Sequence, residues 1–201
     1  LPILLNTNSF SKVNFNFVSF NYTSSIEKYV NKLRNSFSSF IGKGCAFNDP
    51  VHVHGSLENY PIIGVNDESQ LSPNSNIDLK DSLIKSFQIE ETGSYNKEKG
   101  IKALESSDLI IIFGVSFGET DKEWWQAITK MLQNNKTTII IYHFVENLNL
   151  NSTRQLRNET RDAKNRLLRH SNLTNDERKT MESKIFVILS KNLFKFPILE
   201  K

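Results

Sequence analysis

Apolar and polar residues follow one another along this chain in patterns that predict alternating strands and helices. Residues 13–20, VNFNFVSF, alternate and then become apolar, which predicts a strand that enters a buried sheet. Residues 107–114, SDLIIIFG, form the most apolar run and predict a central parallel strand covered on both faces. Residues 137–144, TTIIIYHF, predict another buried strand, and residues 184–190, KIFVILS, a last one.

Weaker strand signals occur between the first two of these runs. Residues 51–56, VHVHGS, and residues 60–67, YPIIGVND, predict two short strands that stop at Gly55 and Gly64. Residues 66–79 are polar and predict a long surface loop.

Helices are predicted where Ser or Thr precedes Glu or Gln by three residues, the spacing of a capping box. This spacing opens four helical patterns, at Ser24 and Glu27, Thr120 and Glu123, Ser152 and Gln155, and Thr174 and Glu177. A further helix is predicted over residues 96–105. Because strands and helices alternate, the sequence predicts a Rossmann-like three-layer α/β sandwich with a mainly parallel sheet.

The helix that follows Thr120 carries two adjacent tryptophans. Trp124, Ile128 and Leu132 recur on one face, which we expect to lie in the core. Adjacent helical positions point in different directions, so we expect only one of Trp124 and Trp125 to face the core. The other would line a groove, an interface or the rim of the core.

Length and composition favour one cytoplasmic domain over residues 1–201. A chain of 201 residues with 38% hydrophobic content can form one good core. The single cysteine, Cys45, allows no disulfide framework and no four-cysteine zinc site, so no metal is expected. No apolar stretch is long enough for a membrane span. Because a strand-like segment follows Leu1 directly, we expect a further segment upstream of it.

Charge is distributed unevenly along the chain. Residues 151–201 contain 12 basic and 6 acidic residues, whereas residues 1–150 contain 13 and 16. The basic helical segment, at about 151–183, is predicted to be an insertion or arm. Its charges surround the helix and no aromatic residues interleave with them, which favours a solvated or partner-binding arm over a nucleic-acid-binding one.

Three polar clusters follow predicted strands: Asn21-Tyr22-Thr23, His54-Gly55-Ser56, and Gly114 to Ser116 with Asp121 beyond. Ligands of open parallel sheets bind beyond the carboxyl ends of the strands, so we expect the clusters to meet in one cleft.

Each candidate residue also has a structural alternative. Asn21 could orient a carboxamide or a water, or could cap the following helix. His54 could act as a general base, or could be a buried histidine bonded to a carbonyl, with His52 as support. The Gly114 turn suits a ribose or phosphate, and Asp121 could bind a ribose hydroxyl or complement the helix dipole.

Three motifs, SFNYTSSIEKY, HVHGS and SDLIIIFGVSFGETDKEWW, occur in an order and spacing that resemble the bacterial abortive-infection AbiH family. The resemblance covers about residues 13–142. That family is a divergent branch of the sirtuin-like fold, whose members bind NAD at the carboxyl edge of the sheet and cleave its nicotinamide glycosidic bond. The resemblance therefore implies NAD as substrate.

The resemblance also implies roles for individual residues. Asn21 matches the asparagine that orients nicotinamide or water, and His54 matches the histidine base. Gly114 and Ser116 match the turn on the adenosine side, and Asp121 matches the aspartate after that turn. The neighbouring Tyr22, Thr23 and Gly55 are further predicted cofactor contacts.

The sequence departs from the sirtuin pattern at three points. Thr23 stands where many sirtuin-like proteins have an aspartate. The four-cysteine zinc module of the deacetylating sirtuins is missing, which argues against deacetylation. The glycine-rich pyrophosphate loop would precede Val13, and we expect it upstream.

The sequence thus predicts a phage-defence effector that hydrolyses NAD and releases nicotinamide. The alternative is a non-catalytic sensor or scaffold for NAD or ADP-ribose. Expected partners are a phage-derived trigger and either further copies of the chain or a defence-complex partner. Nucleic acid is a less favoured partner, and no membrane contact is expected.

Overall fold

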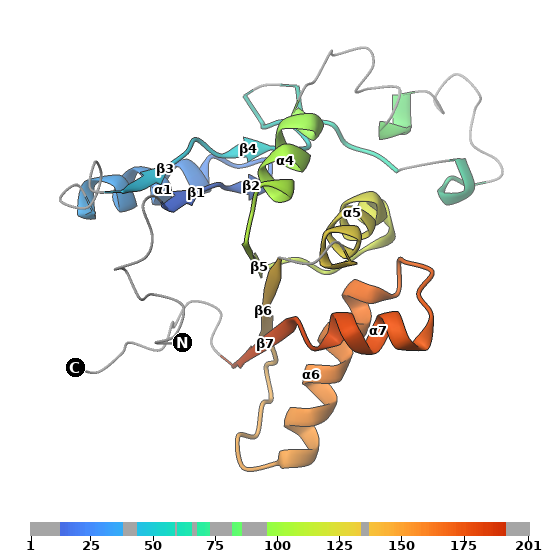
Figure 1. Cartoon of the computed structure of the whole chain (residues 1–201). Coiled ribbons are helices and arrows are strands. Elements are labelled where there is room, and N and C mark those ends of the chain that lie inside the picture. The colour runs from blue at the N-terminus through green and yellow to red at the C-terminus, as the bar shows by residue number, and fades with distance from the viewer. Residues whose placement is uncertain are drawn as a thin grey trace. The chain divides into compact units, whose positions relative to one another are not determined.

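The computed structural model describes residues 13–37, 44–58, 60–65, 68–72, 82–85, 96–133 and 137–191. The chain forms two compact units, Leu1–Ala103 and Leu104–Lys201 (Figure 1). In the described residues the strands form small sheets in which neighbouring strands are parallel. Each of the two units also contains helices. The fold is therefore mixed α/β with parallel strands, and the three-layer sandwich stays a prediction.

Unit 1 begins with two short strands in place of the continuous one predicted over 13–20. They are β1 (Val13–Phe15) and β2 (Val18–Ser19), which pair with β3 (Cys45–Phe47) and β4 (Val51–His52) respectively. Ser19 lies opposite His52 in the second pair. The segments that follow β2 and β4 therefore leave the same edge of this small sheet.

Helices flank these strands. Helix α1 (Ser25–Ser36) follows β2, a 3-10 turn, η2, covers Glu68–Gln70, and α4 (Asn96–Glu105) has the predicted bounds. The capping box predicted for α1 is wrong, because the Ser24 side chain makes no capping hydrogen bond. The Glu27 carboxylate is directed to His52 instead.

The second short strand predicted in this region, over residues 60–67, is not formed. Residues 60–65 contain only an isolated parallel bridge between Val65 and Ile84. Ile62 is nevertheless buried, and its backbone bonds to His54 and to the Tyr22 hydroxyl hold the segment in place. Most of the predicted loop over 66–79 lies outside the described residues.

Unit 2 contains one sheet in the order β5 (Leu109–Phe113), β6 (Thr138–Phe144) and β7 (Ile185–Ser190). The helices of this unit are α5 (Lys122–Gln133), α6 (Thr153–Leu168) and α7 (Asn175–Glu182), and a 3-10 turn, η3 (Glu119–Asp121), precedes α5. All three strands were predicted to within two residues.

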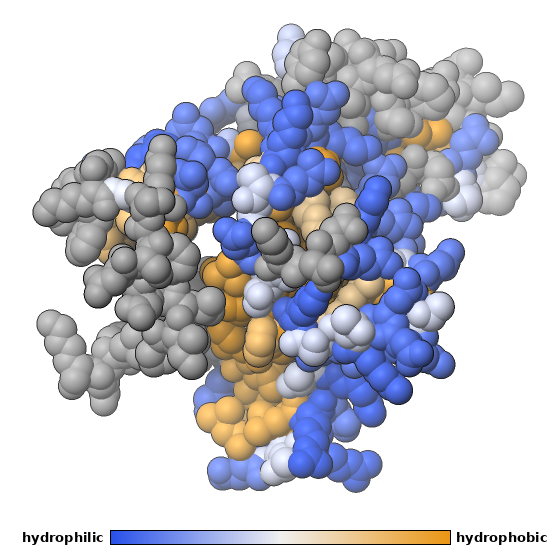
Figure 2. Space-filling view, in the orientation of Figure 1, coloured by the Kyte–Doolittle hydropathy of each residue, from blue (hydrophilic) through white to orange (hydrophobic). Residues whose placement is uncertain are grey.

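Strand β5 has one buried face and one exposed face, whereas Ile139, Ile140 and Ile141 of β6 are all buried. Ile110 and Ile112 of β5 are buried, whereas Leu109, Ile111 and Phe113 alternate with them and are exposed. Figure 2 shows apolar surface over these strands. The prediction that β5 is a central strand covered on both faces is therefore wrong for the described residues, in which β6 is central and β5 lies at the end of the sheet.

The prediction for the two tryptophans is also wrong, because both are buried. Helix α5 packs against both α6 and α7, so more than one of its faces is covered. Trp124 is 4% exposed and Trp125 is 2% exposed. The Trp125 ring meets Phe117 edge-on at 5.0 Å, and its Nε1 donates to the Gly118 carbonyl at 3.0 Å.

Helix α6 is packed into unit 2 and does not stand free as a solvated arm. Ser152 caps it as predicted, accepting a hydrogen bond from the Gln155 backbone N–H. Ala163, Leu167 and Leu168 have no exposed surface, and the helix contacts β7 and α5. None of the helices in the described part of the chain has the length and apolar character that crossing a membrane requires.

The buried stripe of α6 gives a test of this packing. We expect Leu167→Ala to lower the free energy of unfolding by about 2–5 kcal/mol, because it leaves a cavity in the core. Leu150→Ala is the control, since Leu150 is 63% exposed. The measurement is denaturant unfolding, and equal effects of the two substitutions would contradict the packing of α6.

The capping box predicted for α7 is confirmed and gives a test with pH. Hydrogen bonds from the Thr174 backbone N–H, and then from its hydroxyl, hold the pKa of the Glu177 carboxyl below its ordinary value of 4.5. A lowered pKa stabilises the folded state above pH 4.5, and this contribution is lost as pH falls below that value.

We therefore expect Glu177→Ala to lower the melting temperature most near neutral pH and progressively less as pH falls below 4.5. Asp176→Ala is the control, because it removes a carboxylate from the same turn and leaves both Thr174 contacts intact. A pH-dependent loss of the same size in both variants would argue against the Thr174 contacts as its cause.

Candidate functional site

A cavity of about 730 Å³ opens in unit 1, where β2 and β4 end. This volume lies within the range of about 300–1,000 Å³ that is usual for small-molecule sites. Tyr22, Thr23 and Gly55, all predicted to contact the cofactor, line it. The parallel pairing of β2 with β4 thus brings together two of the three polar clusters.

His52 and Glu27 form a hydrogen-bonded pair in the wall of this cavity. The His52 Nε2 lies 2.5 Å from the Glu27 Oε1, and its Nδ1 lies 2.7 Å from the Asn21 carbonyl oxygen. The backbone is held as well, because the Asn96 side chain donates to the His52 carbonyl at 3.0 Å. The imidazole, 10% exposed, is therefore fixed on both ring nitrogens.

The contacts of His52 define where its protons lie. A carbonyl oxygen can only accept, so Nδ1 carries a proton and donates it to Asn21. A contact between Nε2 and a carboxylate oxygen then requires one further proton, which the two groups share. His52 and Glu27 thus share one proton, and the second carboxylate oxygen, Glu27 Oε2, is buried without a hydrogen-bond partner in the described residues. A carboxylate oxygen of this kind can accept a proton as a general base.

The two residues predicted to be catalytic do not line this cavity. The His54 side chain is buried beside the rings of Phe20 and Tyr22, with ring centroids 5.6 and 6.4 Å away. The Asn21 side chain is exposed, and the described contacts of this residue are backbone ones, to His52 and Ser19. Their catalytic roles stay predictions.

Charged side chains of both signs surround the cavity. Lys28 from α1 and Lys99 from α4 supply positive charge, and Glu58 supplies negative charge beside Glu27. Asp49 also lines the cavity, but Arg34 holds it in an ion pair at 2.8 Å. The lysines provide groups that can bind a phosphate.

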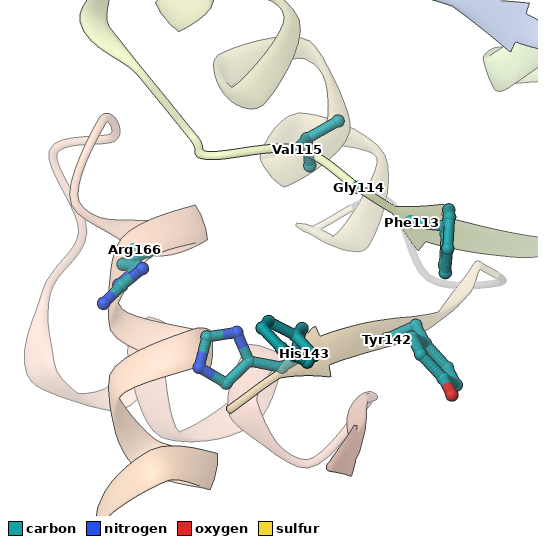
Figure 3. Close-up of a pocket in the computed structure, with 7 residues that line it drawn as sticks. Phe113, Gly114, Val115, Tyr142, His143 and Arg166 are labelled. Atoms are coloured by element: carbon teal, nitrogen blue, oxygen red, sulfur yellow. The ribbon is translucent and has the colours of Figure 1, made fainter. Parts of the chain in front are cut away.

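The third predicted cluster belongs to unit 2. Gly114 has a φ of +69° and lines a smaller cavity, of about 170 Å³, at the end of β5 (Figure 3). Ser116 is exposed, and Asp121 is half-buried at the end of η3. Neither lines this cavity, and the meeting of all three clusters in one cleft stays a prediction.

The turn after Gly114 is held by the end of the basic helix. Phe117 has a φ of +56°, and its carbonyl accepts hydrogen bonds from Arg169 at 2.7 Å and from His170 at 2.9 Å. His170 also lies 3.3 Å from the Glu119 carboxylate. Two residues of the basic segment therefore fix the backbone of this turn.

Sequence reasoning assigned His52 only a supporting role and missed its partner, Glu27. It treated His52 and His54 as alternate residues of one strand, which would place both on one face. β4 ends at His52, and a turn begins at Val53, so the alternation stops between the two histidines. The signal for Glu27 was the capping-box spacing with Ser24, which indicated a different contact.

No group of three or more His, Cys, Asp or Glu that could hold a metal ion occurs within the described ranges. No curated protein and no solved structure matches the chain. The family model for bacteriophage abortive infection AbiH matches residues 3–143, a span that includes the unit 1 cavity and the Gly114 turn. The chain therefore belongs to the bacteriophage abortive infection AbiH family, which indicates a role in phage defence.

Proposed function

We propose that this phage-defence protein binds NAD in the unit 1 cavity and hydrolyses its nicotinamide glycosidic bond, as a sirtuin-like NAD glycohydrolase. The observation that carries the proposal is the His52–Glu27 pair in the wall of a cavity large enough for a nucleotide. The cavity also lies beyond the ends of two parallel strands, where ligands of such sheets bind.

In the proposed reaction, water attacks the anomeric carbon of the nicotinamide ribose as the bond to the nicotinamide nitrogen breaks. Nicotinamide leaves as a neutral molecule, because its ring nitrogen takes the bonding electrons and loses its positive charge. The proton of the attacking water passes to the second carboxylate oxygen of Glu27, Oε2, which makes no hydrogen bond within the described residues, while His52 keeps the shared proton and ADP-ribose remains. An oxocarbenium-like transition state is typical of such reactions.

Other residues of the cavity bind and orient the substrate in this proposal. Lys28 and Lys99 bind the pyrophosphate, and Tyr22, Thr23 and Gly55 lie along the nucleoside. Asn21 acts through its carbonyl, which fixes the His52 ring, and His54 supports the Tyr22 ring from behind. Contacts of Gly114, Ser116 and Asp121 with the rest of the dinucleotide remain part of the sequence-based hypothesis.

The alternative is a sensor that binds NAD or ADP-ribose without cleaving it. Thr23, at the cavity wall, favours this alternative, because it supplies a hydroxyl where many sirtuin-like proteins supply a carboxylate. Both functions use the same cavity, so substitutions in the cavity must be judged by turnover and by binding separately.

Turnover is tested by incubating the full-length protein with NAD, with the phage trigger present, and measuring nicotinamide release. We expect His52→Asn and Glu27→Gln each to lower kcat by about 10²-fold or more, since Glu27→Gln removes the group that takes the proton and His52→Asn removes the imidazole that holds this carboxylate. His54→Asn serves as the matched histidine control, with a thermal melt to show that each variant is folded.

Three outcomes are informative. Loss of turnover only in the His52 and Glu27 variants supports Glu27 as the base and His52 as the residue that positions it. Loss only in His54→Asn returns that role to the residue predicted from the sequence. Absence of turnover in the wild-type protein contradicts the enzyme and leaves the sensor.

Binding is tested by calorimetry with a non-hydrolysable NAD analogue. We expect Lys99→Ala to weaken binding about 10-fold, because it removes a charge-assisted hydrogen bond to phosphate. Lys102→Ala is the control: Lys102 is an exposed lysine of the same helix and does not line the cavity. Equal affinities of the Lys99 and Lys102 variants would place the ligand elsewhere.

A further inference from the structure

The exposed surface of helix α6 carries charge of almost one sign. The charged side chains that it exposes are four arginines and one carboxylate: Arg154, Arg157, Arg161, Arg166 and Asp162. By contrast, α5 exposes one charged residue of each sign, and α7 exposes two acidic residues and one basic residue. Figure 2 shows hydrophilic surface over α6. Among these three helices, only α6 therefore has an excess of exposed positive charge.

Three of these arginines lie on one side of the helix and are called here the arginine stripe: Arg154, Arg157 and Arg161. They are spaced by three and four residues, the spacing that makes side chains neighbours on a helix surface, and they extend over about 10 Å of the helix axis. Ala163, which is fully buried, lies about 200° around the helix from Arg161. The expectation that charges surround this helix is therefore wrong, because one side of it is buried.

The protein leaves the arginine stripe without a counter-charge. Arg154 and Arg157 make no hydrogen bond or ion pair within the part of the chain that the structure describes. Arg161 donates to the side chain of Asn158 at 3.2 Å, and this amide is neutral. The stripe therefore presents three positive charges that remain available to an anion.

The two carboxylates of α6 do not neutralise the stripe. The Glu159 carboxylate lies 3.5 Å from the His143 Nε2 and is directed to that imidazole. Asp162 follows Arg161 directly, and adjacent residues of a helix do not face each other. A ligand of the stripe therefore meets the guanidinium groups and no competing carboxylate between them.

The polar character of the exposed side of α6 indicates the class of this ligand. All residues that the helix exposes are polar, and none is aromatic. Protein partners usually need an apolar centre with aromatic anchors, and single-stranded nucleic acids need rings on which bases stack. A duplex presents its phosphates outward, so that positive charge and hydrogen-bond donors suffice. Arginine also suits a phosphate better than lysine does, because it can donate two parallel hydrogen bonds.

We infer that the arginine stripe of α6 binds the phosphate backbone of a nucleic-acid duplex without reading its base sequence. DNA and RNA duplexes share this chemistry, and the experiment below distinguishes them. Helix α6 lies outside residues 3–143, so membership of the AbiH family does not imply this site. The stripe belongs to unit 2, and none of its residues lines the unit 1 cavity proposed for NAD.

The test is a fluorescence anisotropy titration of labelled duplexes with the full-length protein, at several salt concentrations from about 50 to 200 mM. DNA and RNA duplexes of about 20 base pairs are compared, each in two unrelated sequences, with polyglutamate as a competitor. We expect dissociation constants of about 10⁻⁴–10⁻⁶ M that rise with salt and are the same for both sequences. Tighter binding of DNA or of RNA identifies the duplex that the stripe prefers.

Replacing all three arginines of the stripe with alanine is expected to weaken binding of a DNA duplex about 10-fold or more at low salt. It should also make the slope of log K against log salt shallower by about 2.7, because each phosphate contact contributes about 0.9. Replacement of all three with lysine should retain most of the salt dependence, since lysine keeps the charge. The arginines are exposed, so these changes leave the core intact, and a thermal melt verifies this.

A single pair of variants provides the matched control. Arg157→Ala is expected to make the salt slope shallower by about 0.9, whereas Arg166→Ala should leave it unchanged. Both remove one exposed arginine from α6, but Arg166 lies about 140° around the helix from Arg161 and so is not part of the stripe.

Three results would overturn the inference. Equal effects of Arg157→Ala and Arg166→Ala would show that only the net charge matters. Displacement of the duplex by polyglutamate at equal charge concentration would indicate an acidic protein as the partner. Duplex binding that is absent, or that survives replacement of the whole stripe, would exclude the stripe as the site. No outcome depends on NAD turnover, so this site and the proposed function can fail separately.

Discussion

The parallel pairing of β2 with β4 is the constraint on which the candidate site depends. It places Ser19 opposite His52, so that the chain leaves both strands at one edge of the small sheet. The Asn21 carbonyl then reaches the His52 ring, while α1 brings Glu27 to the other ring nitrogen. Without this pairing, a histidine and a glutamate separated by 25 residues would not meet, since no local contact joins them.

Because of the same pairing, Asn21 contributes to the site through its backbone carbonyl, and its side chain does not line the cavity. The Asn21 carbonyl determines which nitrogen of His52 carries a proton, and so directs the other nitrogen to the carboxylate. An imidazole fixed in this way holds the Glu27 carboxylate in one orientation. Such preorganisation is what a general base needs from its surroundings.

Unit 2 uses its positive charge in two ways. At the C-terminal end of α6, Arg169 and His170 donate to the Phe117 carbonyl and hold the turn after β5, and Trp125 donates to the next carbonyl. Such bonds stabilise a backbone with a positive φ at a residue other than glycine, which is otherwise unfavourable. Arg166, about one turn nearer the middle of α6, has no such protein partner within the described residues and lines a cavity instead.

The sequence by itself determined the buried strands of unit 2, helix α4 and the caps of α6 and α7, because these follow from apolar runs and from contacts within three residues. It also determined family membership, through motifs that lie in order along the chain. The tertiary structure decided which histidine faces the cavity, what Glu27 contacts and that both tryptophans are buried. The first two depend on where strand β4 ends, and the third depends on how many elements pack against α5. These features arise from contacts between residues far apart in the chain, so no local sequence pattern encodes them.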